Sequence, residues 1–272
     1  MTAFIPAYDT EAPSCLDACR KIVEVHHRYK MPATFFIVGK TLEASPDEYR
    51  RLLDDPLFEI ASHSYSHKLL RDHPLGGPGA SLGDMKEEIV RGKEIVERYF
   101  PDRRCLGMRT PYGFPNGLSG APEILRTLCD SGHEYVSSAL WGEQFSMPAP
   151  LKQASDYAAD GFPGLREFPG HGWHENVLKS DKVRLLLLFP PQFPEAVPPA
   201  AIKTPGEEFL YNNKPFIDRA VRENLAFVSL VWHPWSLLRF DPAMEMLDRT
   251  FTYLQEENLR GITYAQLLRG MP

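Results

Sequence analysis

Two histidines separated by three residues are the clearest sign of chemistry in this sequence. His63 and His67 lie among small serine residues, directly after an apolar run. In a helical or tight-turn backbone, side chains four positions apart lie on one face, so both imidazoles could bind one cation. Two neutral imidazoles with a third protein ligand and an open position would form a catalytic metal site. The alternative is a pair of surface or hydrogen-bonded histidines with no ligand.

Other polar clusters follow other apolar runs. Asp9 and Glu11 come after the first run, Arg109 and Tyr112 after a middle one, and His233 after a late one. In a parallel barrel, the carboxyl ends of the strands share one face, where active sites are built. We therefore expect these side chains to converge with the two histidines and to supply a third ligand, a base and an acid.

Alternating strand and helix patterns would position these clusters. About seven strand-helix steps in one chain favour a closed or nearly closed parallel barrel in a single domain spanning 1–272. The hydrophobic pattern predicts strands over 4–8, 33–39, 57–61, 105–108, 134–138, 165–168, 225–232 and 261–263. It predicts helices over 15–29, 46–54, 84–99, 121–131, 214–224, 242–257 and 265–269.

Two proline-rich stretches, 139–164 and 169–213, have no clean period. They are long enough to be substrate-covering loops rather than simple connectors. Within the second, the apolar run 185–189 could form one more strand.

The composition is that of a globular enzyme. The net charge of −6 argues against nucleic acid or an anionic membrane as the main partner, because either favours a basic surface. No apolar run approaches the ~20 residues needed to span a bilayer. The N-terminus shows no secretory signal, so we expect a cytoplasmic protein unless a leader was removed. The sequence does not specify the number of subunits. Four cysteines without a Cys-x-x-Cys pair indicate reduced thiols, and a metal role for Cys15 and Cys19 is the less favoured alternative.

The order of the polar segments resembles a known family. The segments are Tyr8-Asp9-Thr10-Glu11, Ala33-Thr34-Phe35-Phe36, His63-Ser64-Tyr65-Ser66-His67, Arg109-Thr110-Pro111-Tyr112 and Val231-Trp232-His233-Pro234. Their combination resembles the polysaccharide deacetylases, the NodB-like carbohydrate esterase family 4, over most of the chain. The resemblance implies an α/β fold, a distorted barrel of seven strands.

The resemblance also implies an activity and roles for residues. The activity would be metal-dependent removal of an N-acetyl group from an amino sugar or polysaccharide. One divalent ion would be bound, with Zn²⁺ as first choice, although cobalt, nickel or iron accept the same ligands. The implied roles are Asp9 as general base, His63 and His67 as metal ligands, Arg109 as the partner orienting the base, Tyr112 as a backbone donor to the oxyanion, and His233 as general acid.

The first motif departs from the common pattern of two adjacent aspartates, because Thr10 replaces the second. In an extended backbone, Asp9 and Glu11 would project to the same side, so we expect Glu11 to be the third metal ligand. The alternative is that Glu11 is solvated, and that either Asp9 binds the metal or no carboxylate does.

Other residues extend the expected site. Val136 replaces an acidic residue of the fourth motif, and Glu167 is a candidate substitute for tuning His233. His171 and His174 lie outside the usual pattern; they could bind substrate, but a surface loop is the favoured interpretation. Three tryptophans in predicted loops could stack on a sugar or simply close the barrel: Trp141, Trp173 and Trp235.

Three functions remain in competition. The leading one is a metal-dependent hydrolase acting on an N-acylated sugar. The second is a hydrolase of another C–N bond, such as a cyclic imide or ureide, with or without metal. The third is a barrel that binds glycans without catalysis, which would not need this full set of acid, base and ligand residues.

Overall fold

Strand β1 (Ala3–Thr10) lies inside a mostly parallel sheet. The computed structural model describes residues 1–143, 151–173 and 202–271. The strand order is β6-β7-β5-β4-β3-β2-β1-β9-β8, β10 also pairs with β1, and the β6–β7 pair is antiparallel. The other strands are β2 (Ala33–Ile37), β3 (Phe58–Ser62), β4 (Gly107–Phe114), β5 (Tyr135–Ala139), β6 (Ser155–Tyr157), β7 (Phe162–Glu167), β8 (Gly172–Trp173), β9 (Phe227–Trp232) and β10 (Arg260–Gly261).

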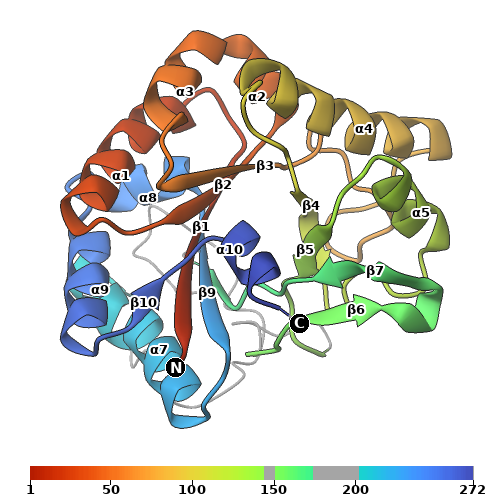
Figure 1. The fold of residues 1–272 in the computed structure, drawn as a ribbon. Coiled ribbons are helices and arrows are strands. Elements are labelled where there is room, and N and C mark those ends of the chain that lie inside the picture. Colours follow the sequence, from red (N-terminus) through yellow and green to blue (C-terminus); the bar gives the residue numbers. More distant parts are fainter. Residues whose placement is uncertain (144–150, 174–201, 272) are drawn as a thin grey trace.

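Helices surround the strands, with α10 in the middle of the ring in the view of Figure 1. They are α1 (Cys15–Tyr29), α2 (Gly39–Ala44), α3 (Pro46–Leu53), α4 (Leu82–Tyr99), α5 (Pro122–Asp130), α6 (Pro205–Glu208), α7 (Lys214–Arg222), α8 (Pro234–Phe240), α9 (Glu245–Glu256) and α10 (Tyr264–Arg269). A 3₁₀ turn (Ala158–Asp160) and a π-helical turn (Phe209–Asn213) complete the described elements. No helix in these parts of the chain is long and apolar enough to cross a bilayer.

A short irregular segment, residues 168–171, connects the β5 side of the sheet to the β9 side. The Phe168 amide donates to the carbonyl of Val136 on β5 at 2.8 Å, and three residues later the His171 amide donates to Ser229 on β9 at 2.9 Å. The ring of strands that forms the barrel is thus completed by residues 168–171 and not by a pair of hydrogen-bonded strands. This arrangement confirms the predicted α/β fold of the distorted barrel type.

Alternation along β1 separates the barrel interior from the helix-covered exterior. Phe4 and Tyr8 belong to the large cluster beneath α1, α3, α7 and α9, whereas Ile5 and Ala7 pack with the inner cluster around Tyr264. Because side chains alternate along a strand, Asp9 continues the inward-facing row. The carboxyl end of β1 therefore directs a carboxylate into the mouth of the barrel.

Most predicted elements are present, and the differences have local causes. The helix predicted over 15–29 is α1 with the same bounds. Helices α2 and α8 were not predicted: they have 6 and 7 residues and no side-chain cap at their start, whereas the equally short α10 begins with a capping box at Thr263. The stretch 139–164 contains β6 and the start of β7, and 185–189 lies outside the described residues. The four cysteines are free, three of them fully buried.

Candidate active site

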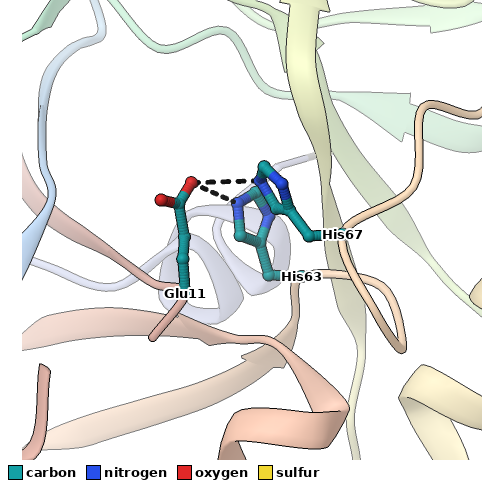
Figure 2. Close-up of side chains that lie close together, drawn as sticks. All are labelled: Glu11, His63 and His67. Carbon is teal, nitrogen blue, oxygen red and sulfur yellow. Dashed lines mark ion pairs between the residues drawn. The ribbon is translucent and has the colours of Figure 1, made fainter. Parts of the chain in front are cut away.

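Glu11, His63 and His67 meet at the carboxyl ends of β1 and β3. Figure 2 shows both imidazoles pointing toward the carboxylate of Glu11. The Nε2 atoms of His63 and His67 lie 3.5 and 3.0 Å from Glu11 Oε1. One ligand atom from each of the three residues lies within 4.8 Å of the others. The sequence-predicted third ligand and the two histidines are therefore brought together.

The orientation of the histidines fits a metal site. His63 Nδ1 lies 2.9 Å from the backbone carbonyl of Arg109, which places the proton on Nδ1 and leaves Nε2 with its lone pair toward Glu11. The Nε2 atoms of both histidines are buried, and neither has a hydrogen-bond partner. A buried acceptor without a partner is costly, and a cation among these two nitrogens and one carboxylate oxygen would satisfy them. The donor set thus fits a divalent transition metal.

Asp9 lies beside this cluster but has a different partner. Arg109 Nη1 donates to Asp9 Oδ1 at 2.7 Å, and both side chains are almost completely buried. Asp9 is absent from the three-residue cluster of candidate ligands, although its other oxygen lies 4.0 Å from His233 Nε2. A buried carboxylate fixed on one oxygen by a guanidinium leaves its second oxygen available at the site.

Several buried groups hold Arg109 in place. Its Nε donates to the Ser137 hydroxyl at 3.2 Å, and its Nη2 donates to the Tyr264 hydroxyl at 3.1 Å. The guanidinium also lies 4.2 Å above the ring of Phe36. Because these contacts come from β5, α10 and β2, the Asp9–Arg109 pair is built into the barrel interior.

His233 and Trp235 close the other side of the cluster. His233 Nε2 lies 3.2 Å from Glu11 Oε1, and Trp235 Nε1 donates to Glu11 Oε2 at 3.4 Å. Burial alone would raise the pKa of Glu11, but the charge of His233 and its hydrogen bond to the carboxylate hold that pKa well below its usual value. The carboxylate is therefore ionised, as a metal ligand must be.

The aromatic residues predicted to contact substrate differ in position. Tyr112 is 44% exposed, and its ring centroid lies 6.3 Å from that of His67. Trp141 is only 2% exposed, so in this structure its ring fills the interior and does not offer a face for stacking on a sugar. The backbone of Trp173 pairs with Val231 in β9, and its side chain lies outside the described part of the chain.

Two further expectations require correction. His171 is fully buried rather than at the surface, because its ring bonds the Lys152 carbonyl and the Ser229 amide; burial lowers its pKa to about 4. Glu167 accepts hydrogen bonds from Ser138 and Ala139 on β5 and from the Tyr157 hydroxyl, so both of its oxygens are engaged in tying the sheet together. His174 lies outside the described residues.

Sequence reasoning missed three residues that support the site: His73, Ser137 and Tyr264. Ser137 and Tyr264 reach Arg109 only because the barrel closes, and no local pattern reveals such a contact. His73 lies six residues beyond His67 in a glycine-rich stretch. The sequence marks His73 only by its position near the two motif histidines, and that position does not distinguish it from the other histidines.

Together, the fold and the site define an α/β barrel with a His/His/carboxylate cluster and a buried Asp–Arg pair at the carboxyl ends of its strands. Comparison with known proteins agrees with this class. Residues 8–121 match the family model described as polysaccharide deacetylase. This matched region includes Asp9, Glu11, His63, His67 and Arg109, so the similarity to the polysaccharide deacetylases extends over the residues of the site.

Individual relatives are distant. A chitooligosaccharide deacetylase of Bradyrhizobium sp. (strain ANU 289) is 23% identical over 144 residues, which are 53% of this chain and 59% of that protein. One from Sinorhizobium fredii (strain NBRC 101917 / NGR234) is 21% identical over 128 residues, 47% of this chain and 54% of that protein. The chain thus spans little more than half the length of these curated relatives.

Solved structures show the shared fold. A Mycobacterium smegmatis protein assigned to the polysaccharide deacetylases has a TM-score of 0.68 and 17% identity, covering 98% of this chain and 90% of that one. A carbohydrate esterase family 4 pseudoenzyme from Bacillus anthracis has a TM-score of 0.57 and 14% identity, covering 98% and 66%. At such identities the likeness extends to the fold and not to the activity.

Proposed function

We propose that this chain is a metal-dependent hydrolase that removes an N-acetyl or other N-acyl group from an amino sugar or its oligomers. The observation that carries the proposal is the convergence of Glu11, His63 and His67 beside the Asp9–Arg109 pair and His233. A ligand cluster alone would suit a structural metal site. A buried carboxylate and an imidazole next to it supply the base and the acid that amide hydrolysis needs.

Glu11, His63 and His67 would hold the ion, and Zn²⁺ suits two imidazoles and one carboxylate. When bound, a divalent ion supplies an activated water and a positive charge that polarises the amide oxygen. The chain's own residues would move the protons. Asp9, held by Arg109, can accept a proton from the attacking water, and His233 can donate one to the leaving nitrogen.

The relatives' names support a carbohydrate substrate. Both curated relatives are chitooligosaccharide deacetylases, and their similarity to this chain is partial. The Tyr112 backbone N–H would stabilise the oxyanion, since a preorganised donor in a dry site lowers the barrier most where charge develops. The half-exposed Tyr112 ring beside His67 offers an apolar surface for the sugar or its acyl group.

The first test is metal content. Untagged native protein and a His63→Ala, His67→Ala double variant would be incubated with zinc, desalted and measured by mass spectrometry. We expect close to one ion per native chain and almost none in the variant. His27→Ala is the matched control, because His27 is half exposed and pairs with Asp55 away from the cluster; it should keep the ion.

Acetate release from N-acetylglucosamine oligomers is the second test. Release by the zinc-loaded protein that is lost in the double variant would support the proposal. Absence of metal from the native chain after incubation with zinc, cobalt and nickel would overturn the ligand assignment. If the protein hydrolysed a cyclic imide and released no acetate from the sugar oligomers, the substrate would be a cyclic imide and not an N-acyl sugar.

A further inference from the structure

Strand β4 bulges at Tyr112, next to the ligand cluster. Its register with β5 shifts between Arg109, opposite Ser137, and Phe114, opposite Ala139. Within this bulge, Tyr112 and Gly113 have φ values of 61° and 59°. The backbone of a residue other than glycine is strained in this left-handed region, so the contacts around Tyr112 must hold it in this conformation.

His73 supplies those contacts. It is 3% exposed, and its ring centroid lies 5.2 Å from that of Tyr112. Its Nδ1 accepts hydrogen bonds from the amides of Leu75 and Gly76 at 3.1 and 3.0 Å, and the backbone of Gly113 lies against the ring. Because Nδ1 accepts from two amides, the proton must reside on Nε2, on the side of the ring that meets the Gly113 backbone.

The turn that His73 organises also contacts Tyr112. His73 and Gly77 exchange two backbone hydrogen bonds of 2.8 Å, which close the turn over 73–77. A Cβ added to Gly76 would lie 3.3 Å from the Tyr112 ring, so the turn packs directly against that ring. The imidazole therefore connects the 73–77 turn on one side to the bulge of β4 on the other.

We propose that His73 is a positioning residue of the active site: by tying the 73–77 turn to the Gly113 backbone, it fixes the backbone N–H and the ring of Tyr112 beside Glu11, His63 and His67. The inference rests on the proposed function, in which the Tyr112 N–H faces the oxyanion. It assigns His73 a role in catalysis through Tyr112, without contact to the substrate or the metal.

Two amide substitutions separate the contacts of the two imidazole nitrogens. In His73→Gln, the side-chain nitrogen can take the place of Nε2 and keep the contact with the Gly113 backbone. In His73→Asn, the oxygen can take the place of Nδ1, so the turn is kept and the contact with the Gly113 backbone is lost. His133→Gln is the matched control, because His133 is also buried but lies between α5 and β5, where its Nδ1 bonds Ser131.

We expect all three variants to bind one ion per chain. In His73→Asn, kcat for acetate release should fall by about 10²-fold with little change in KM, since displacement of a transition-state donor by about 1 Å costs that much. His73→Gln should recover most of this loss, and His133→Gln should match the native protein. A purely structural role of His73 would not produce this difference between Asn and Gln at equal thermal stability.

Hydrogen exchange tests the inference without catalysis. We expect the amides of Tyr112 and Gly113 to exchange at least about 10-fold faster in His73→Asn and at the native rate in His73→Gln, because local opening follows the lost contact. If the native protein released no acetate, the proposed function would fail while this comparison would still decide whether His73 holds the bulge.

Two results would overturn the inference. One is a native kcat in metal-loaded His73→Asn together with native exchange at Tyr112 and Gly113. The other is a loss in both amide variants that is matched by a lower melting temperature and by faster exchange along the whole of β4, which would make His73 an ordinary core residue.

Discussion

Asp9 and Glu11 lie two positions apart at the carboxyl end of β1, and their carboxylates have different partners. Asp9 is bonded by the buried Arg109 at 2.7 Å, whereas Glu11 faces His63, His67 and His233. A carboxylate fixed by a guanidinium is less available to a metal than one surrounded by imidazole nitrogens. The geometry therefore favours Glu11 as ligand and Asp9 as base.

Amide substitutions distinguish these two roles. Glu11→Gln should lose the bound ion, because a neutral amide is a poor ligand for zinc. Asp9→Asn should keep the ion and lose acetate release by about 10²- to 10⁴-fold, the range for removal of a general base. Metal content by mass spectrometry and kcat on the same samples give both answers. If Asp9→Asn lost the ion while Glu11→Gln kept it, Asp9 would be the metal ligand and Glu11 the candidate base.

The residues of the cluster were predictable because their signals are local in the sequence. The His-x-x-x-His spacing and the strand alternation that places Asp9 and Glu11 on one side depend on neighbouring residues alone. The burial of Trp141 and His171 depends on contacts between distant segments, such as the bond from His171 to Ser229. The sequence therefore left two positions open for Trp141, and it suggested the wrong environment for His171.

At the scale of single elements, β4 passes unusually close to a large side chain. A Cβ added to Gly107 would lie 1.9 Å from Cζ of Tyr135, the residue that pairs with it on β5. The Tyr135 hydroxyl is fixed by a 2.7 Å hydrogen bond to Glu59, so the ring cannot move aside without breaking that bond. Gly107 thus allows the aromatic layer of the barrel interior to pack against β4.

Gly107→Ala should accordingly lower the free energy of unfolding by roughly 1–3 kcal/mol, the usual cost of overpacking a core. Gly164→Ala is the matched control within another strand, because a Cβ at Gly164 would meet nothing within 4 Å. That control should change the stability by less than about 0.5 kcal/mol. Urea unfolding followed by circular dichroism measures both, and equal values for the two variants would contradict this account of the interior.

Elements with a full period were predictable, whereas irregular ones were not. Helix α1 has apolar residues on one face through 15 residues, so its bounds followed from the sequence. The bulge of β4 has no such signature, because it is held by His73 from another segment and by the packing of Gly113 against Leu140. Arg109 and Tyr112 were therefore expected after the strand, but both lie within it.

At the scale of the whole molecule, Tyr264 connects the C-terminal helix to the site. Its hydroxyl accepts from Arg109 Nη2 at 3.1 Å and lies 3.1 Å from the Pro169 carbonyl and 2.7 Å from the Ser229 hydroxyl. These partners belong to β4, to the segment that completes the ring, and to β9. One buried hydroxyl thus joins parts of the chain that meet only when the barrel closes.

Tyr264→Phe removes this hydroxyl and leaves buried polar groups without their partner, so it should destabilise the protein by about 1–3 kcal/mol. Tyr29→Phe is the control, since the Tyr29 hydroxyl bonds Thr252 near the surface, and it should cost less than about 0.5 kcal/mol. Because Arg109 also loses a contact that orients it toward Asp9, kcat of Tyr264→Phe should fall while the metal content stays unchanged. Urea unfolding and acetate release on the same variant measure the two effects. A loss of stability with native kcat would mean that Ser137 and Phe36 suffice to orient Arg109, and that Tyr264 acts on barrel closure alone.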